Sequence, residues 1–349
     1  AGVEILGRAF GTWLVAHDCR KATLGGDCRL SSPGFMQAMQ RGLLSCGVDV
    51  VVVGTVPTPL LYFSMFHLDI DAGVMVTGSH NPKDFNGFKL CHGKTALFGE
   101  AIQEIGRIAA AGKFAKGKGK LSEADVIAPY IDRVAGDAQL KPHPLRIVVD
   151  AGNGTGGVVA VPLLRRLGIE VLPLFCEMDG NFPNHHPDPT IPDHLEALRA
   201  EVVRRDADLG IAFDGDADRI GVVDEKGQIL FGDMILLILA RALLRFVPGA
   251  SFVSEVKCSR VLFDEIKKAG GHVVMWKVGH SLIKAKMAED GAQLGGEMSG
   301  HIFFKHRWYG FDDAIYTATR FIEVLSAQSG PASTLLAGVP KTVTTPEIR

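Results

Sequence analysis

Short apolar runs alternate with segments of helical periodicity from the beginning of the chain. Residues 6–16 and 34–45 place their apolar side chains at helical spacing, whereas residues 21–26 and 48–54 have the pattern of strands. The run at 48–54 is almost continuously apolar, which is typical of a strand buried on both faces of a parallel sheet. Two prolines within residues 56–59 separate this strand from a further helix. This alternation predicts an α/β fold with a mostly parallel sheet.

The same alternation recurs in the rest of the chain. The predicted elements are a strand at 145–150, a helix at 158–167, strands at 209–213 and 220–223, a helix at 234–246, and a strand at 251–256. A chain of 349 residues is longer than one hydrophobic core usually fills. The length implies two or three domains, and the pattern along the chain divides into three units. We therefore expect three consecutive, similar α/β domains with mixed, mostly parallel sheets around a central cleft. Their predicted bounds are residues 1–141, 142–228 and 229–341.

Composition and charge exclude several classes of protein. Hydrophobic residues make up 47% of the chain and charged residues 22%, as in a folded soluble protein. The net charge of −2 gives no general attraction to nucleic acid or to an anionic membrane, so we expect neither as a partner. The basic segment 113–120 contains a single aromatic residue and is predicted to be an exposed loop.

The distribution of apolar residues and cysteines indicates a cytoplasmic protein. The most apolar segment, 234–246, is interrupted by Arg241 and is too short to span a bilayer, so we expect a core helix there. No basic and apolar leader opens the sequence. The six cysteines are scattered without a C-x-x-C pair, which predicts buried thiols in a reducing compartment.

A serine lies directly after a predicted strand. The apolar run that begins at Val74 ends at Gly78. Ser79 follows at the strand end, where open α/β sheets place their ligands. Asn81 and Pro82 have the pattern of a helix start, so backbone N–H groups would point at an anion carried on the serine. The alternative is an ordinary strand–turn–helix corner with a capping serine.

Three aspartates follow a second predicted strand. They occupy alternate positions, Asp214, Asp216 and Asp218, and would repel one another unless a divalent cation lay between them. Oxygen ligands alone favour Mg²⁺ or Ca²⁺, and we expect Mg²⁺. An EF-hand calcium loop, with Glu225 as its last ligand, is the alternative. It fails because Arg219 stands where the sharp turn requires glycine and because the flanking segments have strand patterns.

The third loop combines Glu297, Ser299 and His301 between glycines. These side chains can hydrogen-bond vicinal hydroxyl groups, and a histidine can move a proton near neutral pH. Together, the three loops in this order resemble the α-D-phosphohexomutase superfamily, and most closely its bacterial phosphomannomutase/phosphoglucomutase branch. The resemblance extends along the whole sequence.

The resemblance assigns a role to each loop. It implies that Ser79 carries a phosphoryl group and that the three aspartates bind Mg²⁺ together with an oxygen of that phosphoserine. The first unit is then a phosphoserine domain, the second a metal-binding domain and the third a sugar-binding domain. The other implied site residues are catalytic Lys89, Arg219 and His301, and substrate-binding His80, Lys257, His280, Glu297 and Ser299. Without the resemblance, we would interpret Lys89 as a solvated lysine at a strand end and His280 as a neighbour of a helix cap.

The implied activity is a reversible phosphoryl transfer between the 1- and 6-positions of a hexose phosphate. It proceeds through a hexose 1,6-bisphosphate, with glucose 1,6-bisphosphate as activator. A lysine crowded by Mg²⁺ and arginine is expected to have a lowered pKa, so Lys89 or His301 would move the proton. Glu297 and Ser299 would bind the O3 and O4 hydroxyls, which glucose and mannose share. Met298 makes a glucosamine phosphate a less expected substrate, and monomer and dimer both remain open.

The sequence departs from the family pattern at both ends. The family begins with an extended segment bearing an arginine that meets the reacting phosphate, and this sequence starts beyond it. A fourth, α+β domain that anchors the distal phosphate also follows in the family, and residues 342–349 would begin the linker to it. Without these parts, substrate affinity is expected to fall, because remote phosphate contacts position the reacting hydroxyl.

Two other functions fit part of the sequence. Residues 152–157 match G-x-G-x-x-G after a predicted strand, with Glu170 near the distance of a ribose-binding acid, which would suit an NAD(P)-dependent oxidoreductase. A non-catalytic phosphosugar-binding protein is the second alternative. A zinc site at His185 and His186 is disfavoured because adjacent histidines do not easily converge on one metal, so we expect a structural loop there.

Overall fold

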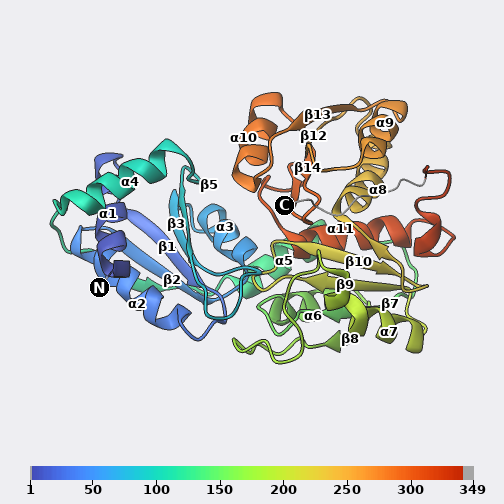
Figure 1. Ribbon diagram of the computed structural model, residues 1–349, viewed down its shortest axis with the longest axis horizontal. Coiled ribbons are helices and arrows are strands. Elements are labelled where there is room, and N and C mark those ends of the chain that lie inside the picture. Colours follow the sequence, from blue (N-terminus) through green and yellow to red (C-terminus); the bar gives the residue numbers. More distant parts are fainter. Residues whose placement is uncertain (1, 341–349) are drawn as a thin grey trace.

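Three β-sheets, each covered by helices, follow one another along the chain (Figure 1). The computed structural model describes residues 2–340, so the predicted linker at 342–349 lies outside the described residues. The sheets have six, five and four strands, in the orders β5-β4-β3-β1-β2-β6, β11-β10-β9-β7-β8 and β13-β12-β14-β15. Each combines parallel and antiparallel pairs, which confirms the predicted fold class.

The first sheet has a parallel centre. It contains β1 (Lys21–Gly26), β2 (Asp49–Thr55), β3 (Ala72–Val76), β4 (Phe88–His92), β5 (Thr95–Ala96) and β6 (Leu121–Glu123). Apolar side chains from α1 (Gly2–Ala16), α2 (Ser32–Ser45) and α4 (Glu100–Ala111) share one core with the sheet. The helix α3 (Thr58–His67) packs in a different core, with Val53 and Met75. Both faces of the central strands are therefore buried, as the apolar run at 48–54 predicts.

The second sheet carries the aspartate loop at one edge. Its strands are β7 (Arg146–Asp150), β8 (Glu170–Leu174), β9 (Leu209–Phe213), β10 (Ile220–Asp224) and β11 (Ile229–Leu230). Its helices are α6 (Gly157–Arg166), the short 3₁₀ helix η1 (Pro192–Leu195) and α7 (Glu196–Arg204), and α5 (Ile127–Asp137) packs against α6. Because β11 pairs with β10, the second sheet extends past residue 228.

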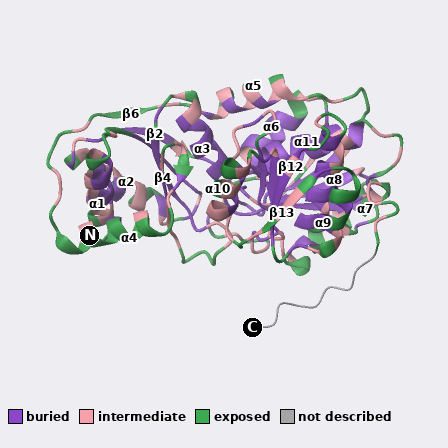
Figure 2. Cartoon of the chain, turned by 90° about the horizontal axis from the view of Figure 1, so that it is seen from above, coloured by how far each residue is buried: buried purple, intermediate pink, exposed green. Residues whose placement is uncertain are grey.

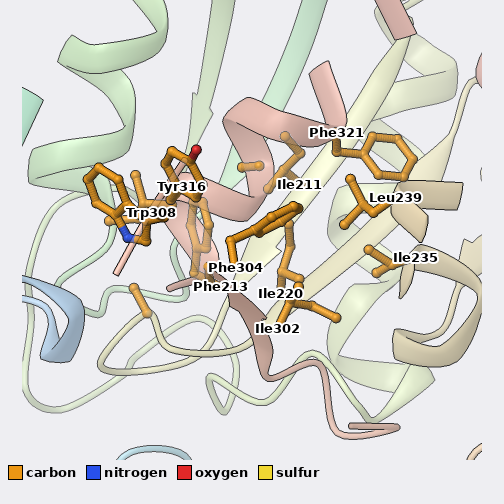
Figure 3. Packing of buried hydrophobic residues seen from close by; sticks show 14 of the residues in the cluster. Ile211, Phe213, Ile220, Ile235, Leu239, Ile302, Phe304, Trp308, Tyr316 and Phe321 are labelled. Atoms are coloured by element: carbon orange, nitrogen blue, oxygen red, sulfur yellow. The ribbon is translucent and has the colours of Figure 1, made fainter. Parts of the chain in front are cut away.

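The third sheet joins the second through a shared core. Its strands are β12 (Ser251–Glu255), β13 (His272–Trp276), β14 (Leu294–Gly296) and β15 (Ile302–Phe304). The helices of this unit are α8 (Gly232–Leu244), α9 (Arg260–Lys268), α10 (His280–Asp290), α11 (Ala314–Ser326) and the 3₁₀ helix η2 (Ala332–Thr334). Figure 3 shows Ile211 and Ile220 of the second sheet packing with Phe304 of the third and Phe321 of α11. The loops at the ends of these sheets are held in place by this continuous core.

Burial follows the sequence pattern closely. The central strands and the inward faces of the helices are buried, whereas exposed residues concentrate in the loops and outer helix faces (Figure 2). All six cysteines are free; Cys46, Cys91 and Cys258 are buried, and the other three are partly exposed. Within residues 2–340, no helix has the length and apolar character needed to cross a bilayer.

Candidate active site

Two loops that are far apart in the sequence meet at the ends of their strands. Ser79, just past β3, donates a hydrogen bond from Oγ to Oδ2 of Asp214, just past β9, at 2.7 Å. The two residues are separated by 135 positions. His80 lies beside them, with Nδ1 3.1 Å from Ser79 Oγ, and burial followed by the charge of Arg219 lowers its pKa. The predicted serine and the predicted acidic loop therefore form one site.

A buried arginine shapes the serine loop. Arg29 donates hydrogen bonds of 2.7 Å to the carbonyl oxygens of Ser79, Asn81 and Pro82. Residues 80–87 consequently form turns, and the helix predicted to start at Asn81 and Pro82 is wrong. The reason is that carbonyl groups which would accept helical hydrogen bonds accept from the guanidinium instead. Ser79 is held at a φ of 47°, a left-handed conformation that non-glycine residues rarely adopt.

The arginine is itself held by an aspartate at the end of β1. Asp27 accepts hydrogen bonds from Arg29 Nε at 3.1 Å, Thr77 Oγ1 at 2.9 Å and the backbone N–H of Gly78 at 3.0 Å. A Cβ atom at Gly78 would lie 2.4 Å from Arg29 Nε, so only glycine fits beside the guanidinium. Asp27 and Arg29 were not predicted as site residues; the D-x-R pattern after a predicted strand is the signal for them in the sequence.

The acidic loop is built to hold a cation. Asp214, Asp216 and Asp218 are all buried, and one carboxylate oxygen from each lies within 4.8 Å of the others. Within residues 2–340, Oδ1 of Asp216 is buried without a hydrogen-bond partner. Burial raises the pKa of Asp214, and the carboxylates of Asp218 and Asp216 raise it further. A divalent cation would relieve this repulsion, and a donor set of oxygen atoms alone fits Mg²⁺.

Lys89 enters the acidic loop from β4. Its Nζ donates to Oδ2 of Asp216 at 2.9 Å and also to Oδ2 of Asp218. Burial alone would lower the pKa of Lys89, but Asp216 and Asp218 outweigh burial and raise it. The lowered pKa expected for Lys89 beside Mg²⁺ and arginine depends on the bound ion and stays a prediction. Thr58, which was not predicted, donates to Asp216 Oδ2 at 2.6 Å, and Oγ1 of Thr77, also not predicted, lies 3.0 Å from the same oxygen.

His301 connects the acidic loop with the third loop. Its Nε2 lies 3.2 Å from Asp218 Oδ1 and 3.2 Å from Arg219 Nε, and its Nδ1 lies 2.7 Å from a Glu297 carboxylate oxygen. Burial lowers the pKa of His301, but Asp218 outweighs it, with help from Glu297, and the pKa rises to about 9. Ser299 Oγ lies 3.3 Å from His301 Nδ1. Four predicted residues, Arg219, Glu297, Ser299 and His301, are thus brought together with Asp218.

The remaining predicted residues lie around this centre. Glu297 accepts a hydrogen bond of 2.7 Å from the backbone N–H of Gly279, directly before His280 at the start of α10. His280 has its ring centroid 5.5 Å from that of His301, and burial lowers its pKa to about 4. Asp312, another missed residue, is fully buried with Oδ2 3.6 Å from His280 Nδ1. Lys257 is exposed two residues beyond β12.

Comparisons with known proteins agree with this arrangement. Three sequence families, described as phosphoglucomutase/phosphomannomutase α/β/α domains I, II and III, match residues 1–116, 128–227 and 231–343. The phosphomannomutase/phosphoglucomutase of Pseudomonas aeruginosa is 46% identical over 98% of this chain and 74% of its own length.

The chain belongs to the phosphoglucomutase/phosphomannomutase family.

Other relatives support the same family. The phosphoglucomutase of Neisseria gonorrhoeae is 47% identical over 98% of this chain and 75% of its own length. A solved phosphoglucomutase/phosphomannomutase family protein from Burkholderia thailandensis superposes with a TM-score of 0.95 at 45% identity, covering 99% of this chain and 76% of that one. The chain is therefore an isomerase of the phosphohexomutase family, and its relatives support a hexose phosphate mutase activity.

Family membership leaves the glycine-rich loop at 152–157 to be explained. A Cβ atom at Gly154 would lie 2.6 Å from the carbonyl oxygen of Gly215, and one at Gly157 would lie 2.2 Å from that of Cys176. The N–H of Thr155 donates to the same Gly215 oxygen at 3.0 Å. Gly154 thus allows close contact with the aspartate loop, and Gly157 allows close contact with the backbone just beyond β8. The alternative of an NAD(P)-dependent oxidoreductase is wrong.

Replacing Gly154 by alanine is expected to displace the aspartate loop. The backbone oxygen at 2.6 Å cannot yield as a flexible side chain would, so we expect a loss of about 1–3 kcal/mol in unfolding free energy and weaker Mg²⁺ binding. Urea unfolding and calorimetry with MgCl₂ measure both effects. Gly106→Ala, at a position of α4 with no atom within 4 Å of the added Cβ, is the matched control. Equal Mg²⁺ affinity in both variants would contradict the proposed contact.

The histidine loop is structural, as its prolines predict. His185 Nε2 lies 3.0 Å from Asp150 Oδ2, whereas His186 Nε2 contacts the carbonyl oxygen of His80. The two imidazole rings therefore contact different partners. His186 thereby links this loop to the backbone beside Ser79.

The His185 pair is expected to make stability depend on pH. Burial lowers the pKa of His185, but the hydrogen bond to Asp150, the charge of Asp150 and the backbone of His186 together outweigh burial and raise the pKa above 6.5. The pair therefore contributes its full stability below pH 6.5 and loses it as the pH rises through the folded-state pKa. Urea unfolding across this window should show a fall in unfolding free energy that is smaller in His185→Gln. The exposed position His272 provides a control, His272→Gln, and identical pH profiles in all three proteins would refute the prediction.

Proposed function

We propose that the chain moves a phosphoryl group between the 1- and 6-positions of glucose and mannose phosphates, with Ser79 as its carrier. The observation that supports this most directly is the 2.7 Å hydrogen bond between Ser79 Oγ and Asp214 Oδ2. It places a partly exposed hydroxyl next to three buried carboxylates, one of which has an unpartnered oxygen. Phosphoryl transfer depends mainly on positioning and charge stabilisation, which such a site can supply.

Asp214, Asp216 and Asp218 would hold Mg²⁺ together with an oxygen of the phosphoryl group on Ser79. When bound, the ion would offset the negative charge that develops on the transferring phosphoryl group. Arg219 would add a second positive charge from the same loop. Lys89 holds its proton at Nζ between Asp216 and Asp218 and would keep these carboxylates oriented.

The proposed reaction consists of two phosphoryl transfers, one from Ser79 to the sugar and one from the sugar back to Ser79. The bond from Ser79 Oγ to phosphorus breaks as the free sugar hydroxyl forms its own bond to phosphorus and releases its proton. The resulting bisphosphate, which glucose 1,6-bisphosphate can supply as activator, turns over and returns its other phosphoryl group to Ser79. The proton is proposed to end on the Ser79 oxygen that leaves phosphorus. Lys89 Nζ or His301 Nε2 would relay it, giving its own proton to that oxygen and taking up the proton of the sugar hydroxyl.

The third loop is proposed to bind the sugar. Glu297 and Ser299 would accept and donate hydrogen bonds to O3 and O4, which glucose and mannose present alike. Lys257 and His280, with His80 across the cleft, would contact phosphate, and the start of α10 at His280 adds the positive end of a helix dipole. We also propose the first, second and third units as the phosphoserine, metal-binding and sugar-binding domains. Free, scattered thiols fit the proposed location in the cytoplasm.

A coupled assay tests the proposal. The chain is supplied with MgCl₂, a trace of glucose 1,6-bisphosphate, and either glucose 1-phosphate or mannose 1-phosphate. We expect both sugars to be converted to their 6-phosphates and turnover to stop when the metal is chelated. Conversion of neither sugar by a fully phosphorylated chain would favour the non-catalytic phosphosugar-binding alternative.

A further inference from the structure

A cavity lies between the first and third units. It has a volume of about 430 Å³ and is enclosed by α3, the turn between β4 and β5, α10, and the loop after β15. In Figure 1, α3 and β5 face α10 across this region. Lys284 lines the cavity and donates a hydrogen bond of 2.6 Å to the fully buried Asp312. The other carboxylate oxygen of Asp312 lies 3.6 Å from His280 Nδ1. None of the residues placed in the candidate active site lines this cavity.

One wall of the cavity is aromatic. Phe66 stacks on Tyr309 with ring centroids 4.5 Å apart, and Tyr309 and Phe311 are nearly parallel, at 8° and 5.9 Å. Tyr62 completes the wall, 5.4 Å from Phe311, and its buried hydroxyl has no hydrogen-bond partner within residues 2–340. Flat, rigid side chains of this kind favour a flat ligand, because ring stacking adds to the burial of apolar area.

The charged residues of the cavity all have the same sign. Lys94, Lys284 and Lys305 line it, and no aspartate or glutamate of the described chain does. Lys94 pairs with Asp69 at 2.8 Å and Lys284 with Asp312, whereas Lys305 makes no ion pair within residues 2–340. An anionic group at the mouth of the cavity would supply the missing partner of Lys305.

We propose that this cavity binds a small planar aromatic anion, such as a fused ring system bearing a carboxylate. The ring would lie against the aromatic wall and the carboxylate would reach Lys305. The volume falls within the range of sites for small organic ligands. A sugar phosphate fits less well, because most of its hydroxyl groups would face apolar side chains without hydrogen-bond partners.

Calorimetry with 2-naphthoate and the Mg²⁺-loaded full chain tests the proposal, with uncharged 2-naphthylmethanol as the matched ligand. We expect 2-naphthoate to bind at one equivalent and at least about tenfold more tightly than the alcohol. Lys305→Gln should weaken 2-naphthoate binding about tenfold, whereas Lys267→Gln, at an exposed position of α9, should not. Ala288→Trp should fill the cavity and abolish binding, whereas Ala285→Trp, on the same helix but outside the lining, should leave it.

Three results would overturn the proposal. They are the absence of binding at millimolar 2-naphthoate, equal affinities in Ala288→Trp and Ala285→Trp, and full displacement of 2-naphthoate by saturating glucose 1-phosphate, which would place the ligand in the catalytic cleft. Thermal unfolding of each variant shows whether it is folded. Because heat of binding is measured and not turnover, this proposal can fail while the phosphoryl transfer proposed above stands.

Discussion

Replacing Ser79 by alanine is expected to abolish phosphate uptake from glucose 1,6-bisphosphate and to lower mutase turnover by at least about a thousandfold. The hydroxyl of Ser79 is the one that meets Asp214 at the mouth of the acidic loop. Thr58 and Thr77 lie nearby but are buried, and their hydroxyls contact Asp216, so neither can replace it. Intact mass after incubation with the bisphosphate measures the uptake directly.

Ser299→Ala is the matched control for this experiment. Ser299 lies in the third loop, beside His301, and the proposed mechanism gives it contact with the sugar but no covalent role. Its variant should still take up one phosphoryl group. Uptake of a full equivalent by Ser79→Ala would show that another residue is the carrier, and the proposed function would then be wrong.

Replacing Asp216 by asparagine is expected to lower Mg²⁺ affinity by at least about a hundredfold and turnover by a similar factor. The substitution removes one negative charge from the buried triad and changes the carboxylate whose second oxygen has no protein partner. It also leaves Lys89 with Asp218 as its single carboxylate partner. Calorimetry with MgCl₂ measures the affinity, and the coupled assay measures turnover.

A buried aspartate at the opposite end of β10 provides the control. Asp224 accepts hydrogen bonds from the backbone N–H groups of Lys226 and Gln228 and belongs to a turn. Asp224→Asn should keep the Mg²⁺ affinity of the native chain even if it lowers stability. Native affinity in Asp216→Asn would instead show that the ion binds elsewhere.

The sequence predicts the parts of the site that are local. Strand patterns place Ser79 and the aspartates at strand ends, and alternate carboxylates in a tight loop indicate a cation without knowledge of the fold. The glycines at 152–157 fit two interpretations, because glycine allows close approach to a phosphate and close approach to another backbone segment equally well. Here the contact is with the carbonyl of Gly215, which lies 60 residues beyond Thr155.

The missed features depend on contacts between distant segments. Arg29 acts on carbonyl groups about 50 positions away, and this contact prevented the helix that Asn81 and Pro82 favour locally. The pKa of Lys89 is raised because two aspartates from another unit surround its Nζ. Asp312 was overlooked because it belongs to none of the three loops that the sequence analysis identified. Periodicity and local motifs carry no information about such partners.

The proposed mechanism depends on a single ion shared by the acidic triad and the phosphoryl group on Ser79. Crystals of the phosphorylated chain soaked in Mn²⁺ would locate this ion by its anomalous scattering. The account predicts one peak within bonding distance of a carboxylate oxygen from each of Asp214, Asp216 and Asp218 and of a phosphoryl oxygen on Ser79. A peak that bonds to the triad without the phosphoryl group, or to neither, would contradict it.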